Sequence, residues 1–289
     1  MFQDRLAQTA QQVQAHVDDA LAPLGTTEVV QAMRYAMQGG KRLRAFLVME
    51  SAGLFDIPPT QSIWPASAIE AIHCYSLIHD DLPCMDDDSL RRGQPTVHIK
   101  WDEATAVLAG DALQSIGFEW CLNPATSPSS DVRTALALGL SQAAGAQGMV
   151  LGQALDIAAE TADVPLNLDQ ITELQQGKTG ALIKWSATAG AVLANQDTAP
   201  LAAYADAIGL AFQIADDILD IEGDAEKAGK RLNKDAAAGK ATFVSLLGLD
   251  GAKQRARELV SMASDTVSVY GERANSLQDA AAFIISRDN

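Results

Sequence analysis

The feature that most constrains the fold is a series of helical stretches that are apolar on nearly every side. The clearest is SQAAGAQGMVLGQALDIAA, residues 141–159. A helix without a polar face has to lie inside a larger protein, so we expect interior helices. Short clusters of turn-forming residues separate such stretches, at 23–26, 56–60, 123–130, 163–167 and 195–200. None is long enough to be a linker, and the sequence therefore predicts one all-α domain, residues 1–289, with about ten or more helices.

Composition supports a helical, globular protein. Hydrophobic residues make up 48% of the chain and aromatic residues only 5%, while Ala and Leu recur throughout. The 21 Lys and Arg residues are outnumbered by 37 Asp and Glu residues, giving a net charge of −16. This balance argues against nucleic acid or an anionic membrane surface as a partner.

Cysteine usage and hydropathy predict a cytoplasmic protein without a membrane span. Cys74, Cys84 and Cys121 are odd in number and form no CxxC pair, so neither a disulfide framework nor a zinc site is indicated. Lys184 interrupts the most apolar stretch before it reaches the ~18 residues that a spanning helix needs. The polar, helical start of the chain does not resemble a signal peptide.

An aspartate cluster occurs twice in similar surroundings. Asp80, Asp81 and Asp86 follow the stretch EAIHCYSLIH, and a second group follows AIGLAFQIA. The second group consists of Asp216, Asp217 and Asp220. Carboxylates next to apolar helices repel one another and resist burial, so each cluster predicts a cationic partner.

The spacing within each cluster favours a metal ion. Asp216 and Asp220 are four residues apart, which places them on one helix face. Pro83 should end the first helix and allow Asp86 to fold back toward Asp80. Mg²⁺ suits such sites because it takes a few carboxylate oxygens and fills its other positions with water and substrate phosphate. A solvated acidic helix end explains one cluster alone, but two clusters indicate a phosphorylated substrate.

Basic residues gather where an acidic protein that binds phosphate would need them. The motif GGKRLR contains Gly40, Lys41 and Arg44, and Arg91 with Arg92 follows the first aspartate cluster. Lys41 and Arg44 are three residues apart and can reach the same phosphate, and the glycines permit close backbone approach. Further lysines are Lys178, Lys230 and Lys240. Taken singly, each would more often be a surface residue.

The order of these motifs resembles that of the trans-prenyl diphosphate synthases, in particular the bacterial farnesyl type. The matching segments are GGKRLR, HCYSLIHDDLPCMDDDSLRRG, LAGDAL, GKTG, FQIADDILD and a downstream GK pair. The resemblance implies the type I isoprenoid synthase fold, with a deep central cleft. It also implies a homodimer and magnesium-dependent, head-to-tail joining of isopentenyl diphosphate to the allylic dimethylallyl and geranyl diphosphates.

The resemblance also implies a role for each motif residue. The phosphates of isopentenyl diphosphate would be bound by Gly40, Lys41, Arg44, His73 and Arg92, with Lys240 as a further substrate-binding residue. The allylic diphosphate would be held through about three Mg²⁺ ions by Asp80, Asp81, Asp86, Asp216, Asp217 and Asp220. Arg91, Lys178 and Lys230 would add positive charge, and Thr179 and Gln213 would line the developing carbocation. The departing diphosphate would act as the base.

Product length is expected to depend on Tyr75, five residues before Asp80. In the family a large aromatic residue here resembles the floor of the farnesyl-forming tunnel, and small Ser76 would leave the space above it open. Geranyl or geranylgeranyl diphosphate is the alternative product. Among departures from the usual pattern, Ala45 stands where Pro is common, and Phe243 with Val244 where Tyr-Pro is frequent.

Three more distant functions remain open from the residues. His79 and Asp80 spell the HD pair of a helical phosphohydrolase, but four scattered histidines offer few ligands and leave DDILD without a role. A type I terpene cyclase shares the first aspartate cluster but would have no use for the basic residues around Lys41. A non-catalytic binding subunit would be expected to have lost one aspartate cluster.

Overall fold

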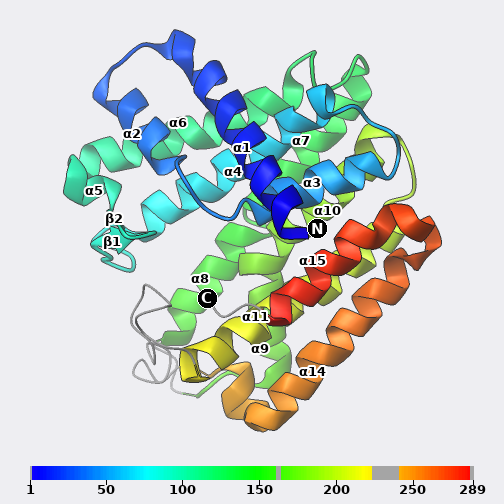
Figure 1. Ribbon diagram of the computed structural model, residues 1–289. Helices are drawn as coiled ribbons and strands as arrows, with labels where there is room; N and C mark the ends of the chain where they lie inside the picture. Colours follow the sequence, from blue (N-terminus) through cyan, green and yellow to red (C-terminus); the bar gives the residue numbers. More distant parts are fainter. Residues whose placement is uncertain (1, 161–163, 223–240, 287–289) are drawn as a thin grey trace. The chain divides into compact units, whose positions relative to one another are not determined.

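The computed structural model describes residues 2–160, 164–222 and 241–286, and helices dominate it (Figure 1). The first elements are α1 (Phe2–Leu21), η1 (Ala22–Leu24), α2 (Glu28–Ala36), α3 (Leu43–Gly53), α4 (Pro59–Asp80), β1 (Leu90–Arg91), β2 (Gln94–Pro95), α5 (Val97–Lys100) and α6 (Glu103–Leu122). They are followed by α7 (Ser130–Ala144), α8 (Met149–Glu160), α9 (Leu168–Gln175), η2 (Gln176–Gly180), α10 (Ala181–Leu193), α11 (Ala199–Glu222), α14 (Phe243–Val267), η3 (Ser268–Ala274) and α15 (Asn275–Ser286). The prediction of an all-α chain is confirmed.

Backbone contacts divide the chain into two compact units. The first comprises Met1–Leu140 with Ala189–Gln196, and the second comprises Ser141–Thr188 with Asp197–Asn289. Two of the boundaries fall within α7 and α10, and the third lies between α10 and α11. A single domain over residues 1–289 stays a prediction.

The first unit is built around α4, which is buried on most of its circumference. The helix begins at Pro59, where the fixed φ and the missing N–H of proline are tolerated. α3 and α6 pack against it (Figure 1). A Cβ on Gly117 of α6 would lie 2.9 Å from the Ile72 side chain, so glycine permits this close contact. On the α3 side, the Gly190 N–H of α10 donates to the Ser51 hydroxyl over 3.2 Å.

A two-stranded antiparallel hairpin interrupts the helices after α4. Leu90 pairs with Pro95 and Arg91 with Gln94. The two turn residues, Arg92 and Gly93, have φ values of 53° and 73°. Positive φ at both positions is typical of tight two-residue hairpin turns, so Gly93 suits its place. The hairpin brings Arg91 and Arg92 back beside α4.

The second unit packs α11 against α14 and α15. The Tyr204 hydroxyl of α11 donates to the carbonyl oxygen of Leu277 over 2.7 Å. α14 begins with a capping box in which Thr242 and Ser245 satisfy each other's backbone N–H groups. None of the described helices combines the length and apolar character that crossing a lipid bilayer requires.

The prediction for residues 141–159 was wrong in part. The segment does not form one helix, because turns at 145–148 separate α7 from α8. Gly145 and Gly148 lie at this break, where their poor helix propensity favours a turn. Met149 of α8 is buried, but four other large apolar side chains of this helix are exposed, namely Val150, Leu151, Leu155 and Ile157.

Candidate active site

The first aspartate cluster lies where α4 ends and the chain reverses. Asp80 is the last residue of α4, and Asp81 follows as its C-cap. The backbone N–H of Asp86 donates to the carbonyl oxygen of Asp80 over 2.8 Å. Pro83 lies within this turn, where its ring prevents a regular helix from continuing. The prediction that Asp86 folds back toward Asp80 is confirmed for the backbone.

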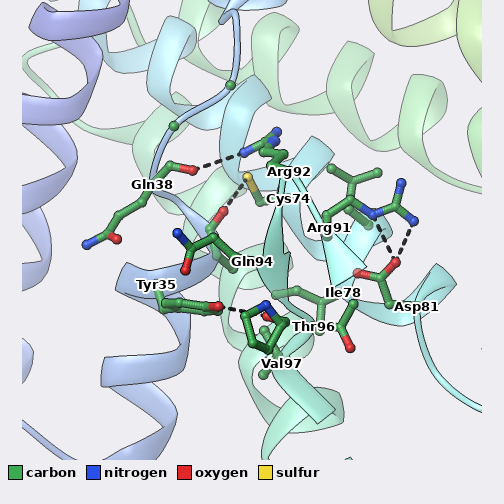
Figure 2. Close-up of a pocket in the computed structure, with 15 residues that line it drawn as sticks. Tyr35, Gln38, Cys74, Ile78, Asp81, Arg91, Arg92, Gln94, Thr96 and Val97 are labelled. Carbon is green, nitrogen blue, oxygen red and sulfur yellow. Dashed lines mark hydrogen bonds and ion pairs between the residues drawn. The ribbon is translucent and has the colours of Figure 1, made fainter. Parts of the chain in front are cut away.

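Arg91 forms an ion pair with Asp81 across the turn (Figure 2). Its Nε donates to Asp81 Oδ1 over 2.9 Å, and its Nη2 contacts the same oxygen. A second carboxylate, that of Asp88, lies 3.5 Å from Arg91 Nη2. Burial raises the pKa of Asp81, although the hydrogen bond from Arg91 opposes the shift. A further positive charge here would favour the ionised carboxylate.

Arg92 lies against the glycine turn of the GGKRLR motif. Gly39 and Gly40 have φ values of 69° and 82°, which favour glycine. A Cβ on Gly40 would meet the guanidinium carbon of Arg92 at 2.9 Å, so a larger residue here would displace the Arg92 side chain. Arg92 Nη1 donates to the carbonyl oxygen of Gln38 over 3.2 Å (Figure 2). The structure thus brings together two residues predicted to bind phosphate.

His73 lies among arginines. Burial lowers its pKa well below the usual value, and the charges of Arg44, Arg92, Arg42 and Arg91 lower it further. Like charges this close repel one another, so the group is suited to bind an anion. Arg44, His73 and Arg92 are brought together as predicted, and Lys41 is exposed beside them.

A cavity of about 330 Å³ opens between α2, α4 and the hairpin (Figure 2). Polar and charged groups and apolar side chains share its wall. Among them are Gln38, Gly40, Cys74, Leu77, Ile78, Asp81, Arg91, Arg92 and Val97. The Tyr35 hydroxyl closes one side by donating to the carbonyl oxygen of Pro95 over 2.7 Å. Such a cavity can receive a small molecule with an anionic and an apolar part.

The second aspartate cluster lies on α11 in the other unit. Asp216 and Asp220 are partly exposed, whereas Asp217 is buried. Asp217 Oδ1 accepts from Gln213 Nε2 over 3.2 Å, and Oδ2 accepts from the backbone N–H of Phe243 over 2.7 Å. Because Phe243 is the first residue of α14, Asp217 also anchors the start of that helix.

Lys178 and Thr179 lie in η2, a π-helical turn between α9 and α10. Lys178 Nζ forms an ion pair with Asp156 Oδ2 of α8 at 2.7 Å. A Cβ on Gly152 would lie 2.0 Å from the Lys178 backbone nitrogen, so only glycine lets α8 approach this turn. π-turns inside helices often mark functional sites.

Comparisons with known proteins identify the family. The polyprenyl synthetase family matches residues 26–276. The chain belongs to the polyprenyl synthetase family. It is 42% identical to the farnesyl diphosphate synthase of Escherichia coli (strain K12), over 99% of both chains.

Solved structures of similar proteins show which fold the chain has. An FPP/GFPP synthase from Zymomonas mobilis superposes with a TM-score of 0.90 at 45% identity, over 98% of each chain. A geranyltransferase from Helicobacter pylori, complexed with magnesium and isoprenyl diphosphate, has a TM-score of 0.80 at 34% identity, over 99% of this chain and 96% of that one. The fold is the all-α type I isoprenoid synthase fold.

The carboxylates of this polyprenyl synthetase fit magnesium by their chemistry. Within the described residues, no three His, Cys, Asp or Glu side chains are gathered into a ready-made metal site. Mg²⁺ does not need one, because it binds through one or two carboxylates and completes its shell with water and substrate phosphate. That the clusters around Asp80 and Asp216 face each other stays a prediction. Lys230 and Lys240 lie outside the described residues.

Tyr75 and Ser76 lie on α4, one to two turns before Asp80. Tyr75 is buried and packs edge-on against His79, with ring centroids 5.8 Å apart. Burial raises the pKa of Tyr75, an effect that Gln114 opposes and Asp80 reinforces. The Ser76 hydroxyl donates to the carbonyl oxygen of His73 over 2.9 Å. The role of Tyr75 as the floor of the product tunnel stays a prediction.

Two acidic residues that form ion pairs here were not among the predicted site residues. Asp156 pairs with Lys178, and Glu70 pairs with Arg42 of the GGKRLR motif. Glu70 had a signal, since it is a lone acid in the apolar run SAIEAIHC. Asp156 also stands in an apolar stretch, LGQALDIAA, and its side chain is partly buried, so a cationic partner is expected for it too.

Proposed function

We propose that this polyprenyl synthetase joins isopentenyl diphosphate to dimethylallyl and then geranyl diphosphate, and releases farnesyl diphosphate. The observation that carries the proposal is the arrangement at the carboxyl end of α4. There an aspartate cluster lies beside the arginines that surround His73. A site of this kind suits diphosphates that are held partly by cations of the protein and partly by a metal.

The arginine side of the site receives isopentenyl diphosphate. Its phosphates contact Gly40, Lys41, Arg44, His73 and Arg92, and Lys240 is a further candidate. The apolar wall of the neighbouring cavity, with Leu77, Ile78 and Val97, is suited to exclude water.

The allylic diphosphate is assigned to the two aspartate clusters. Their carboxylates, namely Asp80, Asp81, Asp86, Asp216, Asp217 and Asp220, are proposed to hold about three Mg²⁺ ions. When bound, the metal neutralises the diphosphate as it departs. The magnesium in the Helicobacter pylori relative supports this assignment. Arg91, Lys178 and Lys230 add positive charge, which favours departure of the anion.

The reaction then requires no side-chain nucleophile. The allylic C–O bond breaks, and its electron pair leaves with the diphosphate. The double bond of isopentenyl diphosphate attacks the allylic cation, and a proton passes to the released diphosphate. Thr179 and Gln213 are proposed to face the cation with their side-chain oxygens.

The farnesyl product is inferred from buried Tyr75. The sequence similarity to a farnesyl diphosphate synthase supports it. The Zymomonas mobilis relative is described as an FPP/GFPP synthase, so a longer product is the second candidate. A cytoplasmic homodimer is proposed on the resemblance to the family.

Product analysis tests the proposal directly. The protein is incubated with isopentenyl and dimethylallyl diphosphates plus Mg²⁺, and the prenyl alcohols released by phosphatase are identified. Farnesol as the main product supports the proposal. Longer products would exclude the farnesyl assignment, and the absence of any condensation would exclude the activity.

A further inference from the structure

A buried ion pair lies beneath the phosphate-binding loop. Arg42 and Glu70 have side chains that are 1% and 3% exposed, and Arg42 Nη1 lies 3.1 Å from Glu70 Oε2. Arg42 Nη2 also donates to the carbonyl oxygen of Met37. A buried pair of this kind is often no more stabilising than apolar residues of the same shape. Stability is therefore a weak reason for its presence.

The pair accompanies an unusual backbone. Arg42 has φ 54° and ψ 35°, a left-handed conformation that is unfavourable for a residue with a Cβ. Gly39 and Gly40 before it also have positive φ. This turn sends Arg42 inward while Lys41 stays exposed. The contacts of the Arg42 side chain are what hold the turn in this form.

The second oxygen of Glu70 fixes the other end of the loop. Glu70 Oε1 accepts from the backbone N–H of Ala45 over 3.0 Å. Ala45 is in the first turn of α3, where N–H groups have no partner within the helix. One carboxylate thus ties down residues 42 and 45, and Arg44 lies between them.

Glu70 also balances charge. Arg42 is one of the four arginines whose charges act on His73, and His73 lies one turn beyond Glu70 on α4. Arg91 has its own carboxylate partner in Asp81. Glu70 offsets the positive charge of Arg42 within this group of arginines.

We infer that Glu70 and Arg42 are positioning residues for isopentenyl diphosphate. They do not touch the substrate, but they set the loop that presents Lys41 and Arg44 to its phosphates. The identity of the anion rests on the proposed function.

The first test is Glu70→Gln in the full-length protein. The dissociation constant for isopentenyl diphosphate is measured by titration calorimetry, and KM for both substrates by steady-state kinetics. We expect isopentenyl diphosphate to bind about 10- to 100-fold more weakly, the loss that follows when a group that orients a metal ligand is removed. The KM for dimethylallyl diphosphate should stay within about threefold of wild type, because its proposed contacts are untouched.

The double variant Arg42→Met/Glu70→Leu separates positioning from stability. Apolar residues of similar volume can replace a buried ion pair without loss of stability, so this variant should fold even where Glu70→Gln does not. It should bind isopentenyl diphosphate as weakly as Glu70→Gln. Tyr204→Phe is the matched control, because it removes a buried hydrogen bond in the other unit and should leave both KM values unchanged.

Two results would overturn the inference. One is a folded double variant that binds isopentenyl diphosphate within threefold of wild type. The other is an equal loss of affinity for both substrates, which would indicate a general structural role. If the wild-type protein binds isopentenyl diphosphate but forms no prenyl product, the proposed activity fails, while the binding comparison still decides the role of Glu70.

Discussion

Asp217 shows how one residue of a motif can differ from its neighbours. Asp216 and Asp220 are partly exposed on α11, but Asp217 is buried and accepts the first backbone N–H of α14. The motif alone does not reveal this difference, because it depends on which segment packs against the helix. Asp217 therefore has a structural role, since it anchors the start of α14, in addition to its proposed role near the metal.

Asp217→Ala and Asp217→Asn should separate these roles. The alanine variant loses the acceptor for Phe243, and its free energy of unfolding should fall by about 1–3 kcal/mol, the cost of leaving a buried donor unsatisfied. The asparagine variant keeps an oxygen acceptor and should lose less. Both should lower turnover about 10- to 100-fold through the lost charge. Urea denaturation and steady-state kinetics measure the two effects; equal stability of the two variants would contradict the anchoring role.

Tyr75→Ala should lengthen the product. The side chain is buried about 7.5 Å along the helix axis from Asp80, at 1.5 Å per residue. Removing it leaves the phosphate contacts intact and opens space for a longer chain. We expect products of twenty carbons or more, identified by chromatography after dephosphorylation. Tyr204→Phe serves as a control that should keep the wild-type product. A Tyr75→Ala enzyme that still stops at fifteen carbons would remove Tyr75 as the determinant.

The resemblance to the trans-prenyl diphosphate synthases, and not spacing alone, predicted which residues belong to the arginine site. Arg44, His73 and Arg92 are far apart in the sequence, yet the structure gathers them. The inward orientation of the Arg42 side chain could not be predicted. It depends on a left-handed backbone conformation, which has no recognisable signal in a run of basic residues. Glu70 was missed although it is a lone acid in an apolar run, because its partner Arg42 became visible only once the loop was folded.

At the scale of elements, the close contact between α8 and the π-helical turn η2 depends on residue 152 being a glycine, which has no side chain. Gly152→Ala would place a Cβ 2.0 Å from the backbone nitrogen of Lys178. Backbone on both sides leaves little room to relax, so the free energy of unfolding should fall by about 1–3 kcal/mol or more. The shift should also disturb the ion pair of Lys178 with Asp156 and lower turnover.

Gly180→Ala is the matched control for this substitution. Its Cβ would come no closer than 3.6 Å to the Gln175 carbonyl oxygen, an ordinary contact. Alanine also has the higher helix propensity, so stability should be unchanged or slightly higher. Chemical denaturation of both variants decides the point: if Gly152→Ala is as stable as Gly180→Ala, the contact is not tight in solution.

Helices whose ends are marked by clusters of turn-forming residues were predicted well, and elements without such clusters were not. The turn clusters near 56–60 and 195–200 lie at real helix boundaries. The prediction that residues 141–159 form an interior helix was wrong in part. Apolar composition implies burial only where a neighbouring element covers the helix, and hydropathy does not show which neighbours are present. The hairpin after α4 was also not foreseen, since strands of two residues are too short to give a pattern.

For the whole molecule, lowering the pH below about 6.5 should reduce stability. The pKa of His73 is lowered chiefly by burial, and that of His16 by burial against the opposing effect of Asp19. Below the usual histidine pKa of 6.5 the unfolded chain takes up protons that the folded chain does not bind, so unfolding becomes easier.

The raised pKa of Asp81 has the opposite effect on stability. Its stabilising contribution is complete only below the usual value of 3.8 and is lost as pH rises.

Melting temperatures between pH 7.5 and 5.5 measure this effect. The wild-type melting temperature should fall across the range, and His73→Asn should reduce the fall. Adding His16→Asn to His73→Asn should reduce the fall in melting temperature further, because the effects of two residues that share no partner add. A pH dependence that is the same in His73→Asn and wild type would mean that His73 is not buried as a neutral side chain.

The π-turn at Gln176–Gly180 has a consequence for insertions and deletions. Such a turn is a regular helix with one additional residue, confined locally because the packing of both flanks is fixed. On one flank Ile171 and Leu174 of α9 are buried, and on the other Gly190 of α10 contacts Ser51. Deleting Gly177 should therefore restore an unbroken helix without rotating either flank. We expect a lower melting temperature, because a residue with a side chain would then face Gly148 and Gly152 where Gly177 now lies. Turnover should also fall, since the proposed positions of Lys178 and Thr179 would change. The packing of this segment against α8 should therefore fix its length, so that an insertion or deletion here is tolerated less well than one in an exposed loop.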